Sequence, residues 1–405
     1  MLRVIVDTSD RLQTDAPSHL SDLERLQARL VARGEETIDL GRFAPDLTPD
    51  PEWLAAIAAE IKKPGAFRPA QPGTVARFQA EAQAWFGRRF DVKVLRRGLV
   101  LTSGVKEAVY HLAMGLVNPG DHVAVPTPSY PFYRTAVRYA GGIPVELPLR
   151  EAQDYLPNLA RLESQGPLPR ILLLNYPHNP TSTPPDRAFY TDLVRWARKR
   201  NVMVVQDFAY GEIYFDHAPP ISILTIPGAR HVAVELHSFS FTYHVPGLRL
   251  GFAVGHPDML RAIQETQSRL AAGPPEFAAA AAAQAFGLYD RVSQANNREF
   301  TRRRDVMAQG LDTLGWSYRR PAAGGFFWVR SPRRDDVRLT RRLLLKSGVL
   351  LAPGSAFGEA GEGYLRLALT RNTSQIEGAV RRMSRLWPQR LKRMRGTWGP
   401  SDSSA

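Results

Sequence analysis

Short apolar runs recur along the middle of the chain, between about residues 98 and 255. Residues 99–102, 122–125, 171–174, 202–205 and 232–235 are examples, and segments with helical periodicity separate them. Strands buried on both faces read as continuous apolar runs, whereas half-exposed strands alternate apolar and polar residues. The pattern therefore predicts an α/β region built on a sheet of mostly parallel strands.

The flanking regions show other patterns. Leu23, Leu26, Leu30 and Val31 recur at helical spacing, and a proline-rich stretch, 44–51, leads into a helix that begins near Glu52. An alanine-rich segment, 277–286, opens a long predicted helix that runs through Arg302. The remainder mixes helical patterns with short strands at 325–329 and 364–367, which is typical of a smaller α+β unit.

Composition narrows the class of protein. The chain has 405 residues and no cysteine, so disulfides, thiol catalysis and cysteine metal ligands are excluded, and we expect no metal site. No run approaches the roughly 18 apolar residues that a membrane helix needs. The N-terminus lacks the basic and then apolar layout of a signal peptide, so we expect a cytoplasmic protein.

The net charge of +14 raises the possibility of nucleic-acid binding, because basic surfaces attract phosphate. The arginines are spread along the chain, however, with modest clusters at 302–304 and 390–395, and lysines number only seven. No recognition module accompanies the charge. A basic nucleic-acid-binding scaffold therefore remains the weakest of three hypotheses.

Residues 102–108, Thr-Ser-Gly-Val-Lys-Glu-Ala, lie between a predicted strand and the helix Val109 to Leu116. Free N–H groups and the positive end of the helix dipole make such a turn suitable for a phosphate. Taken alone it is equally an ordinary strand-to-helix loop. Its value comes from the motifs that follow it in order.

Those motifs carry the chemistry of a cofactor pocket. They are Pro-Thr-Pro-Ser-Tyr-Pro at 126–131, Asn-Tyr-Pro-His-Asn-Pro-Thr at 175–181, Asp-Phe-Ala-Tyr at 207–210, Ser-Phe-Ser-Phe at 238–241 followed by Gly-Leu-Arg-Leu-Gly at 247–251, and Tyr-Leu-Arg-Leu at 364–367. The ordered set resembles class I/II aminotransferases, the fold-type I enzymes that use pyridoxal 5'-phosphate. The resemblance runs from about residue 35 to 388, closest to the diaminopimelate/aspartate aminotransferase-like branch.

The resemblance implies a role for each matching residue. Tyr130 stacks on the pyridine ring, Asp207 pairs with the ring nitrogen, and Asn179 and Tyr210 share the phenolic oxygen. The phosphate is held by Gly104, Val105 and Lys106 at the helix start and by Ser238, Ser240 and Arg249. Arg366 resembles the arginine that binds the substrate's α-carboxylate, and Ser182 stands where glycine is usual.

Phe241 is the main departure from the family. The family reads Ser-x-Ser-Lys there, and that lysine carries the cofactor as a Schiff base and moves the proton. A phenyl ring does neither, although acid–base catalysis alone contributes roughly 10²–10⁴-fold. Phe43 also stands where a glycine beside the substrate is common, and Arg68 where a tyrosine reaches the neighbouring subunit's phosphate.

The first hypothesis is therefore a pseudoenzyme that binds pyridoxal or pyridoxamine 5'-phosphate non-covalently and has lost or nearly lost transamination. The second is an active enzyme with altered pyridoxamine-phosphate chemistry and another base, Tyr243 or His244. A lysine elsewhere, such as Lys106, is disfavoured as the attachment point. Either way the ligand on the substrate side would be a small amino acid or 2-oxoacid.

The same resemblance implies a fold-type I architecture and a homodimer. We expect an N-terminal arm, 1–45, packed with the small domain, a large cofactor-binding domain with a mixed, mainly parallel sheet, 46–285, and a small α+β C-terminal domain, 286–390. Residues 391–405 would form a basic, disordered tail.

Overall fold

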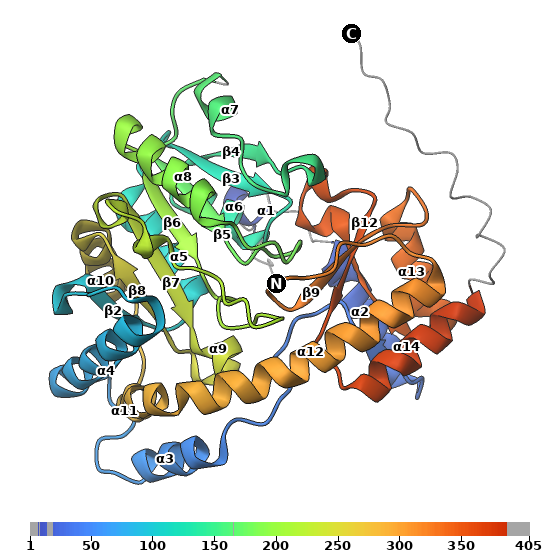
Figure 1. Cartoon of the computed structure of the whole chain (residues 1–405), viewed down its shortest axis with the longest axis horizontal. Coiled ribbons are helices and arrows are strands. Elements are labelled where there is room, and N and C mark those ends of the chain that lie inside the picture. The colour runs from blue at the N-terminus through green and yellow to red at the C-terminus, as the bar shows by residue number, and fades with distance from the viewer. Residues whose placement is uncertain (1–6, 8, 14–18, 165, 387–405) are drawn as a thin grey trace, which may run out of the picture.

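A computed structural model describes residues 7, 9–13, 19–164 and 166–386. The predicted tail, 391–405, lies outside the described residues. Two sheets lie side by side, with the larger one on the left of Figure 1 and the smaller one on the right. Within the described ranges no helix has both the length and the apolar character needed to cross a membrane.

The larger sheet has seven strands in the order β2-β8-β7-β6-β5-β3-β4. β8 is antiparallel to both of its neighbours, and the other pairs are parallel. The five apolar runs are confirmed as strands, whereas β4 and β8 had not been singled out. The strands are β2 (Leu99–Thr102), β3 (His122–Thr127), β4 (Ile143–Pro148), β5 (Ile171–Asn175), β6 (Met203–Asp207), β7 (Ala233–Ser238) and β8 (Gly251–Gly255).

Apolar side chains on alternate strand positions feed two separate cores. On one face Leu172 and Val204 join the cluster that contains Trp53, Phe78 and Phe86. On the other face residues such as Leu173 and Val205 join a cluster with Val109 and Leu112 of α5. Burial on both faces is why the strands read as unbroken apolar runs.

The smaller sheet, β11-β12-β9, is antiparallel, and β1 pairs with β10 in a separate parallel ladder. The long helix α12 runs from α11 beneath the larger sheet to the smaller sheet (Figure 1), where Phe300, Met307 and Leu311 enter a third core. The strands are β1 (Ile38–Asp39), β9 (Phe326–Arg330), β10 (Val349–Leu350), β11 (Ala352–Pro353) and β12 (Tyr364–Ala368).

The helices differ from the sequence expectations at several ends. The α-helices are α1 (Asp10–Gln13), α2 (His19–Ala32), α3 (Pro51–Ile61), α4 (Pro72–Phe90), α5 (Val105–Leu116), α6 (Phe132–Tyr139), α7 (Leu159–Ser164), α8 (Arg187–Arg200), α9 (Phe239–Thr242), α10 (Pro257–Leu270), α11 (Glu276–Ala285), α12 (Tyr289–Leu314), α13 (Asp336–Ser347) and α14 (Thr373–Leu386). The predicted single helix through Arg302 is wrong: a 3₁₀ turn, Phe286–Leu288, divides it, and its second part continues to Leu314.

Two further boundaries are corrected. α5 begins at Val105, not Val109, because Gly104 with φ of 96° turns the chain directly into the helix. Leu23 and Leu30 of α2 are buried as expected, whereas Val31 is 54% exposed and lies off the packed face. The earlier start of α5 places its first N–H groups next to the end of β2.

Candidate functional site

The predicted site residues gather where strands of the larger sheet end. Asn175 closes β5, Asp207 closes β6 and Ser238 closes β7, and these three parallel strands are neighbours. Ligands of open α/β sheets bind outside the carboxyl ends of the strands. The topology therefore brings together motifs that are up to about 60 residues apart in sequence.

The phosphate part of the predicted site combines the start of α5 with Arg249. Gly104 has φ of 96°, and a Cβ built on it would lie 2.9 Å from Nη2 of Arg249, so a side chain there would shift the guanidinium from its present position. Arg249 donates from Nη2 to the carbonyl of Ser103 (3.2 Å) and from Nη1 to the carbonyl of Pro246 (3.1 Å). In the described part of the chain no carboxylate pairs with this exposed guanidinium, so an anion suits it.

The two serines lie at the start of α9. The Ser238 hydroxyl accepts a hydrogen bond from the backbone N–H of Ser240 at 3.1 Å, which caps the helix. Both residues are buried beside the Arg249 turn. The side chain of Lys106 extends to Phe132, with its Nζ 4.8 Å from the ring centroid. The backbone N–H groups of Val105 and Lys106 lie in the first turn of α5, where N–H groups have no partner within the helix.

Asp207 is a buried carboxylate that lacks a basic side-chain partner among the described residues. Its Oδ2 accepts from the hydroxyl of Tyr133 at 2.6 Å, and its Oδ1 accepts from the N–H of Ala209 at 2.9 Å. Burial raises the pKa of Asp207 to about 6, although these hydrogen bonds act in the opposite direction. A buried carboxylate of this kind is stabilised by a cationic nitrogen, so the site fits a protonated pyridine.

Sequence reasoning missed Tyr133. It is fully enclosed, its pKa is raised well above the ordinary value by burial and by Asp207, and it fixes the orientation of that carboxylate. Its only sequence signal is its place on α6, three residues after Tyr130 and just beyond the motif at 126–131. Tyr130 itself is 38% exposed and meets Tyr133 edge to face at 5.9 Å. That leaves one face of the Tyr130 ring free to stack on a ligand.

Asn179, Tyr210 and Arg366 form one continuous hydrogen-bonded chain. The Asn179 amide donates to the Tyr210 hydroxyl at 3.3 Å, and Arg366 Nη1 donates to Asn179 Oδ1 at 2.8 Å. Arg366 also donates from Nη2 to the carbonyl of Gly41 at 2.6 Å and lies between the rings of Phe326 and Phe357. Burial lowers the pKa of Arg366 to about 10, and its Nε is buried without a partner.

Ser182, at the position where the family usually has glycine, adopts φ of 57°. Its hydroxyl accepts from the N–H of Phe326 at 3.1 Å, which ties the turn after β5 to the first residue of β9. A strained left-handed serine is tolerated here because its side chain satisfies a buried backbone donor. The departure from glycine thus has a structural reason.

Phe241 lies in a cluster of four aromatic rings. Its centroid is 4.7 Å from Tyr210 and 5.3 Å from Phe43. Phe326 completes the cluster, at 4.7 Å from Phe43 and 5.3 Å from Tyr210. The rings come from four distant segments, so Phe241 is integrated into the packing on this side of the site. We call these four residues, Phe43, Tyr210, Phe241 and Phe326, the four-ring cluster.

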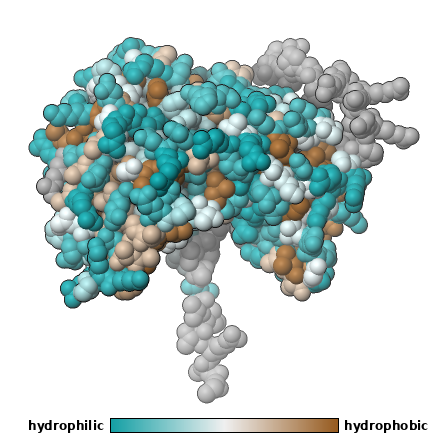
Figure 2. All heavy atoms as spheres, turned by 60° about the horizontal axis from the view of Figure 1, so that its bottom comes forward, coloured by the Kyte–Doolittle hydropathy of each residue, from teal (hydrophilic) through white to brown (hydrophobic). Residues whose placement is uncertain are grey.

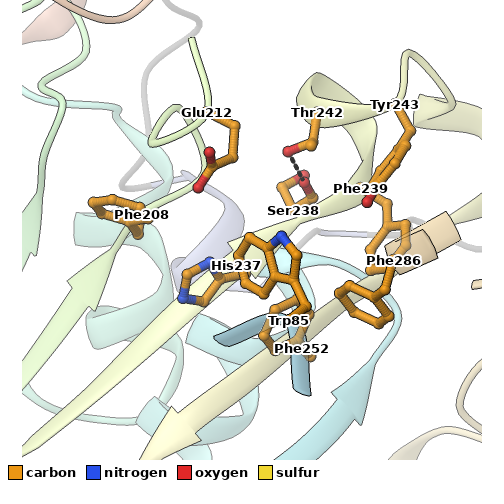
Figure 3. A pocket seen from close by; sticks show the side chains of 10 residues that line it. All are labelled: Trp85, Phe208, Glu212, His237, Ser238, Phe239, Thr242, Tyr243, Phe252 and Phe286. Carbon is orange, nitrogen blue, oxygen red and sulfur yellow. Dashed lines mark hydrogen bonds between the residues drawn. The ribbon is translucent and has the colours of Figure 1, made fainter. Parts of the chain in front are cut away.

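The two alternative bases point elsewhere. Tyr243 is buried, donates its hydroxyl hydrogen to the carbonyl of Ala285 at 3.0 Å, and lines a small interior cavity with Phe239 and Phe286 (Figure 3). His244 stacks on Phe300 at 5.9 Å, and burial lowers its pKa to about 4. Neither side chain contacts Asn179 or Asp207 in the described structure, so the geometry does not favour either as a base.

Comparison with known proteins agrees with this architecture. Residues 35–383 match the family model for aminotransferases of class I and II. LL-diaminopimelate aminotransferase of Aquifex aeolicus is 35% identical, over 93% of this chain and 98% of its own length. The enzyme of the same name from Maridesulfovibrio salexigens is 36% identical with the same coverage of both chains.

Solved structures show the same relationship. A substrate-bound BacF from Bacillus subtilis superposes with a TM-score of 0.87 at 28% identity, over 94% of this chain and 98% of that one. A probable N-succinyldiaminopimelate aminotransferase from Thermus thermophilus superposes with a TM-score of 0.85 at 29% identity, over 91% and 100%. The chain belongs to the class I and II aminotransferases, a family of fold-type I enzymes that depend on pyridoxal 5'-phosphate.

Proposed function

We propose that this chain binds pyridoxal or pyridoxamine 5'-phosphate without a covalent bond and has lost ordinary transamination. The cofactor, when bound, supplies the electron sink that amino-group transfer requires. The observation that carries the proposal is the position of Phe241, whose ring packs on Tyr210 at 4.7 Å where the family has its reactive lysine. A phenyl ring offers neither an amine for attachment nor a base for the proton.

The contacts of the predicted site residues support non-covalent binding. Arg249, the start of α5 and the two serines would hold the phosphate, and Asp207 would pair with the ring nitrogen. A charge-assisted hydrogen bond contributes on the order of 1.5–3 kcal/mol. Tyr210 and Asn179, already hydrogen-bonded to each other, would share the phenolic oxygen. Together these contacts support retention of the cofactor in the absence of the lysine.

Arg366 supports a carboxylate ligand on the substrate side, since it is a buried cation that pairs with no carboxylate among the described residues. The relatives named LL-diaminopimelate aminotransferase favour a small amino acid or 2-oxoacid. Phe43 restricts the space available: a Cβ on Gly325 would lie 1.9 Å from its ring, so the ring rests directly on the backbone of residue 325.

We also propose a homodimer. The segment that follows α3 carries Phe67, which is 75% exposed, next to the exposed Arg68. Backbone hydrogen bonds from Ala70 to Pro274 and from Glu276 to Arg68 hold this segment against the start of α11. Figure 2 looks onto the side of the molecule that lies at the bottom of Figure 1, where apolar side chains are scattered between hydrophilic ones. Leu54 and Ile61 of α3 are also exposed. A second copy covering Phe67 would bring Arg68 close to a neighbouring phosphate site.

The test of this function is the absorbance spectrum of the purified protein with added pyridoxal 5'-phosphate, followed by borohydride reduction and intact mass. We expect a saturable spectral change that dialysis reverses and no mass added at the site by reduction. Incubation with a panel of amino acids and 2-oxoacids should give no product above the protein-free control. A reducible attachment accompanied by amino-acid turnover would contradict the proposal.

Gly104→Ala should weaken binding of pyridoxal 5'-phosphate roughly tenfold, since the methyl group would displace the Arg249 guanidinium and remove a charge-assisted hydrogen bond. Isothermal titration measures the change. Gly120→Ala is the matched control, because Gly120 has a similar φ of 87° but nothing within 4 Å of its Cβ. Equal losses in both variants would show that backbone strain, not the phosphate contact, is responsible.

A further inference from the structure

One wall of the proposed cofactor site is made of aromatic faces. Phe241 and Phe43 are only half-buried, and their rings lie beside Tyr210, whose hydroxyl marks the phenolic-oxygen end of the site. The ligand substituent that neighbours the phenolic oxygen must therefore meet Phe241. This is the substituent that a lysine at position 241 would have had to reach.

That wall carries no basic side chain of its own. Lys106 is the single lysine in the segments that supply the site residues, and its Nζ lies over Phe132 at 4.8 Å. The Arg366 guanidinium stacks on Phe326, with its Cζ 4.6 Å from the ring centroid, and donates to Asn179 and to the carbonyl of Gly41. One fixed cation therefore lies against Phe326, and the ring of the cluster that is open to an added cation is that of Phe241. Aromatic faces attract an ammonium group through the negative charge of the ring face, most strongly where water is excluded.

We infer that the four-ring cluster makes this site selective for the aminated form of the cofactor, pyridoxamine 5'-phosphate. It would bind this form more tightly than forms with a neutral group, an aldehyde or an alcohol, at the carbon that carries the amine. The inference rests on the proposed non-covalent binding and specifies which ligand the site retains. Two effects favour binding of the amine form over the aldehyde form. The aldehyde form gains no covalent bond here, and the ammonium of the amine form gains the half-buried ring of Phe241.

The charges around the wall are consistent with a single added ammonium. Asp207 is the buried carboxylate of the site, and each of its oxygens accepts one hydrogen bond, from Tyr133 and from the N–H of Ala209. A carboxylate oxygen has a second acceptor position, so Asp207 can also accept from the ring nitrogen. Arg249 and the α5 start serve the phosphate end. At the end of the site near Phe241, the aromatic rings face the ligand together with the hydroxyl of Tyr210 and the amide of Asn179. These two polar groups can donate hydrogen bonds to a phenolate oxygen that lies next to an ammonium.

The experiment compares three ligands by isothermal titration at pH 7.5: pyridoxamine 5'-phosphate, pyridoxine 5'-phosphate and pyridoxal 5'-phosphate. Pyridoxine 5'-phosphate has a hydroxyl in place of the ammonium and is otherwise the same molecule. We expect the amine form to bind roughly tenfold more tightly than pyridoxine 5'-phosphate, the ratio that a desolvated cation–π contact supports.

Phe241→Leu should reduce this ratio to near one while the affinity for pyridoxine 5'-phosphate stays within about twofold, since leucine keeps an apolar side chain without a ring face. Phe43→Leu is the second variant, in case the first fails to fold, and should reduce the ratio in part. Phe132→Leu removes a ring outside the four-ring cluster and should leave the ratio unchanged.

Equal affinity of the unaltered protein for the amine and the alcohol would overturn the inference while the proposed binding function stands. A preference that survives both Phe241→Leu and Phe43→Leu would also overturn it, because the rings would then not be its source. Failure of all three ligands to bind would overturn the proposed function and the inference together.

Discussion

Phe241→Lys is expected to attach pyridoxal 5'-phosphate covalently and to restore amino-group transfer. The segment around position 241 has its cap at Ser238, and the Arg249 guanidinium and the Asp207 carboxylate lie near it, so the amine would enter a site whose other proposed groups are present. Packing against Tyr210 and Phe43 would desolvate the amine and lower its pKa, which favours the neutral nucleophile. Borohydride reduction followed by peptide mass mapping would locate the attachment at position 241.

The expected gain in single-turnover conversion of an amino acid is at least about 10²-fold, the lower end of what a positioned acid–base group contributes. Phe241→Arg is the matched control, because arginine brings a charge of the same sign but cannot make the covalent bond. A folded Phe241→Lys protein that binds the cofactor and yet gives no reducible product would contradict the expectation. The double variant with Phe43→Gly then tests whether the Phe43 ring is the obstruction, since it frees the space beside Gly325.

Asp207→Asn should have opposite effects on the free protein and on cofactor binding. The folded-state pKa of Asp207, about 6, exceeds the unfolded value of about 3.9, so the native state holds the proton more tightly than the unfolded chain does. The contribution of this group to the free energy of unfolding therefore falls as pH rises from about 4 to about 6. Above about pH 6 the full cost of burying the ionised carboxylate is present. Removing the charge should stabilise the ligand-free protein at pH 8 by up to roughly 3 kcal/mol.

The same substitution should weaken cofactor binding roughly ten- to a hundredfold, because a neutral amide no longer pairs with the protonated ring nitrogen. Urea unfolding at pH 4 and pH 8 and isothermal titration with pyridoxamine 5'-phosphate measure the two effects. Tyr133→Phe is the control, because it keeps the carboxylate but removes the hydrogen bond that lowers the pKa of Asp207. The pH midpoint of cofactor binding should therefore move upward, and the loss of affinity should be smaller than in Asp207→Asn. Unchanged affinity in Asp207→Asn would exclude the proposed pairing.

The sequence predicted the parts of this protein whose signal is local and repeated. Buried strands such as β5 and β6 are continuous apolar runs, and the polar residues that end them, Asn175 and Asp207, follow at once. β8 was not singled out, because glycines at both of its ends leave only Phe252, Ala253 and Val254 as an apolar run. Its glycines serve close backbone approach, since a Cβ on Gly255 would lie 2.3 Å from the carbonyl oxygen of Ala233. The sequence alone does not indicate that residue 255 must lack a Cβ, because the contact is with another strand.

Contacts between distant segments were the least predictable part of the site. The hydrogen bond from Tyr133 to Asp207 spans 74 residues, and that from Arg366 to Gly41 spans 325 residues. The motif order located Asp207 and Arg366, but nothing in either motif indicates its partner. Lys106 is a further case, since the motif does not indicate that its Nζ lies over the ring of Phe132.

The ring of Phe43 has a kinetic consequence. It touches Tyr210 and Phe241 at the end of the larger sheet, Phe326 of β9 in the smaller sheet, and Phe300 of α12 at 6.4 Å. Any hinge motion that parts the two sheets must separate these rings and expose their faces to water, which costs apolar burial. Where ligand entry requires the two sheets to part, this separation of rings would add to the barrier for entry and exit. Residence time at the site would follow the size of the residue at position 43, independently of the contacts that the ligand itself makes.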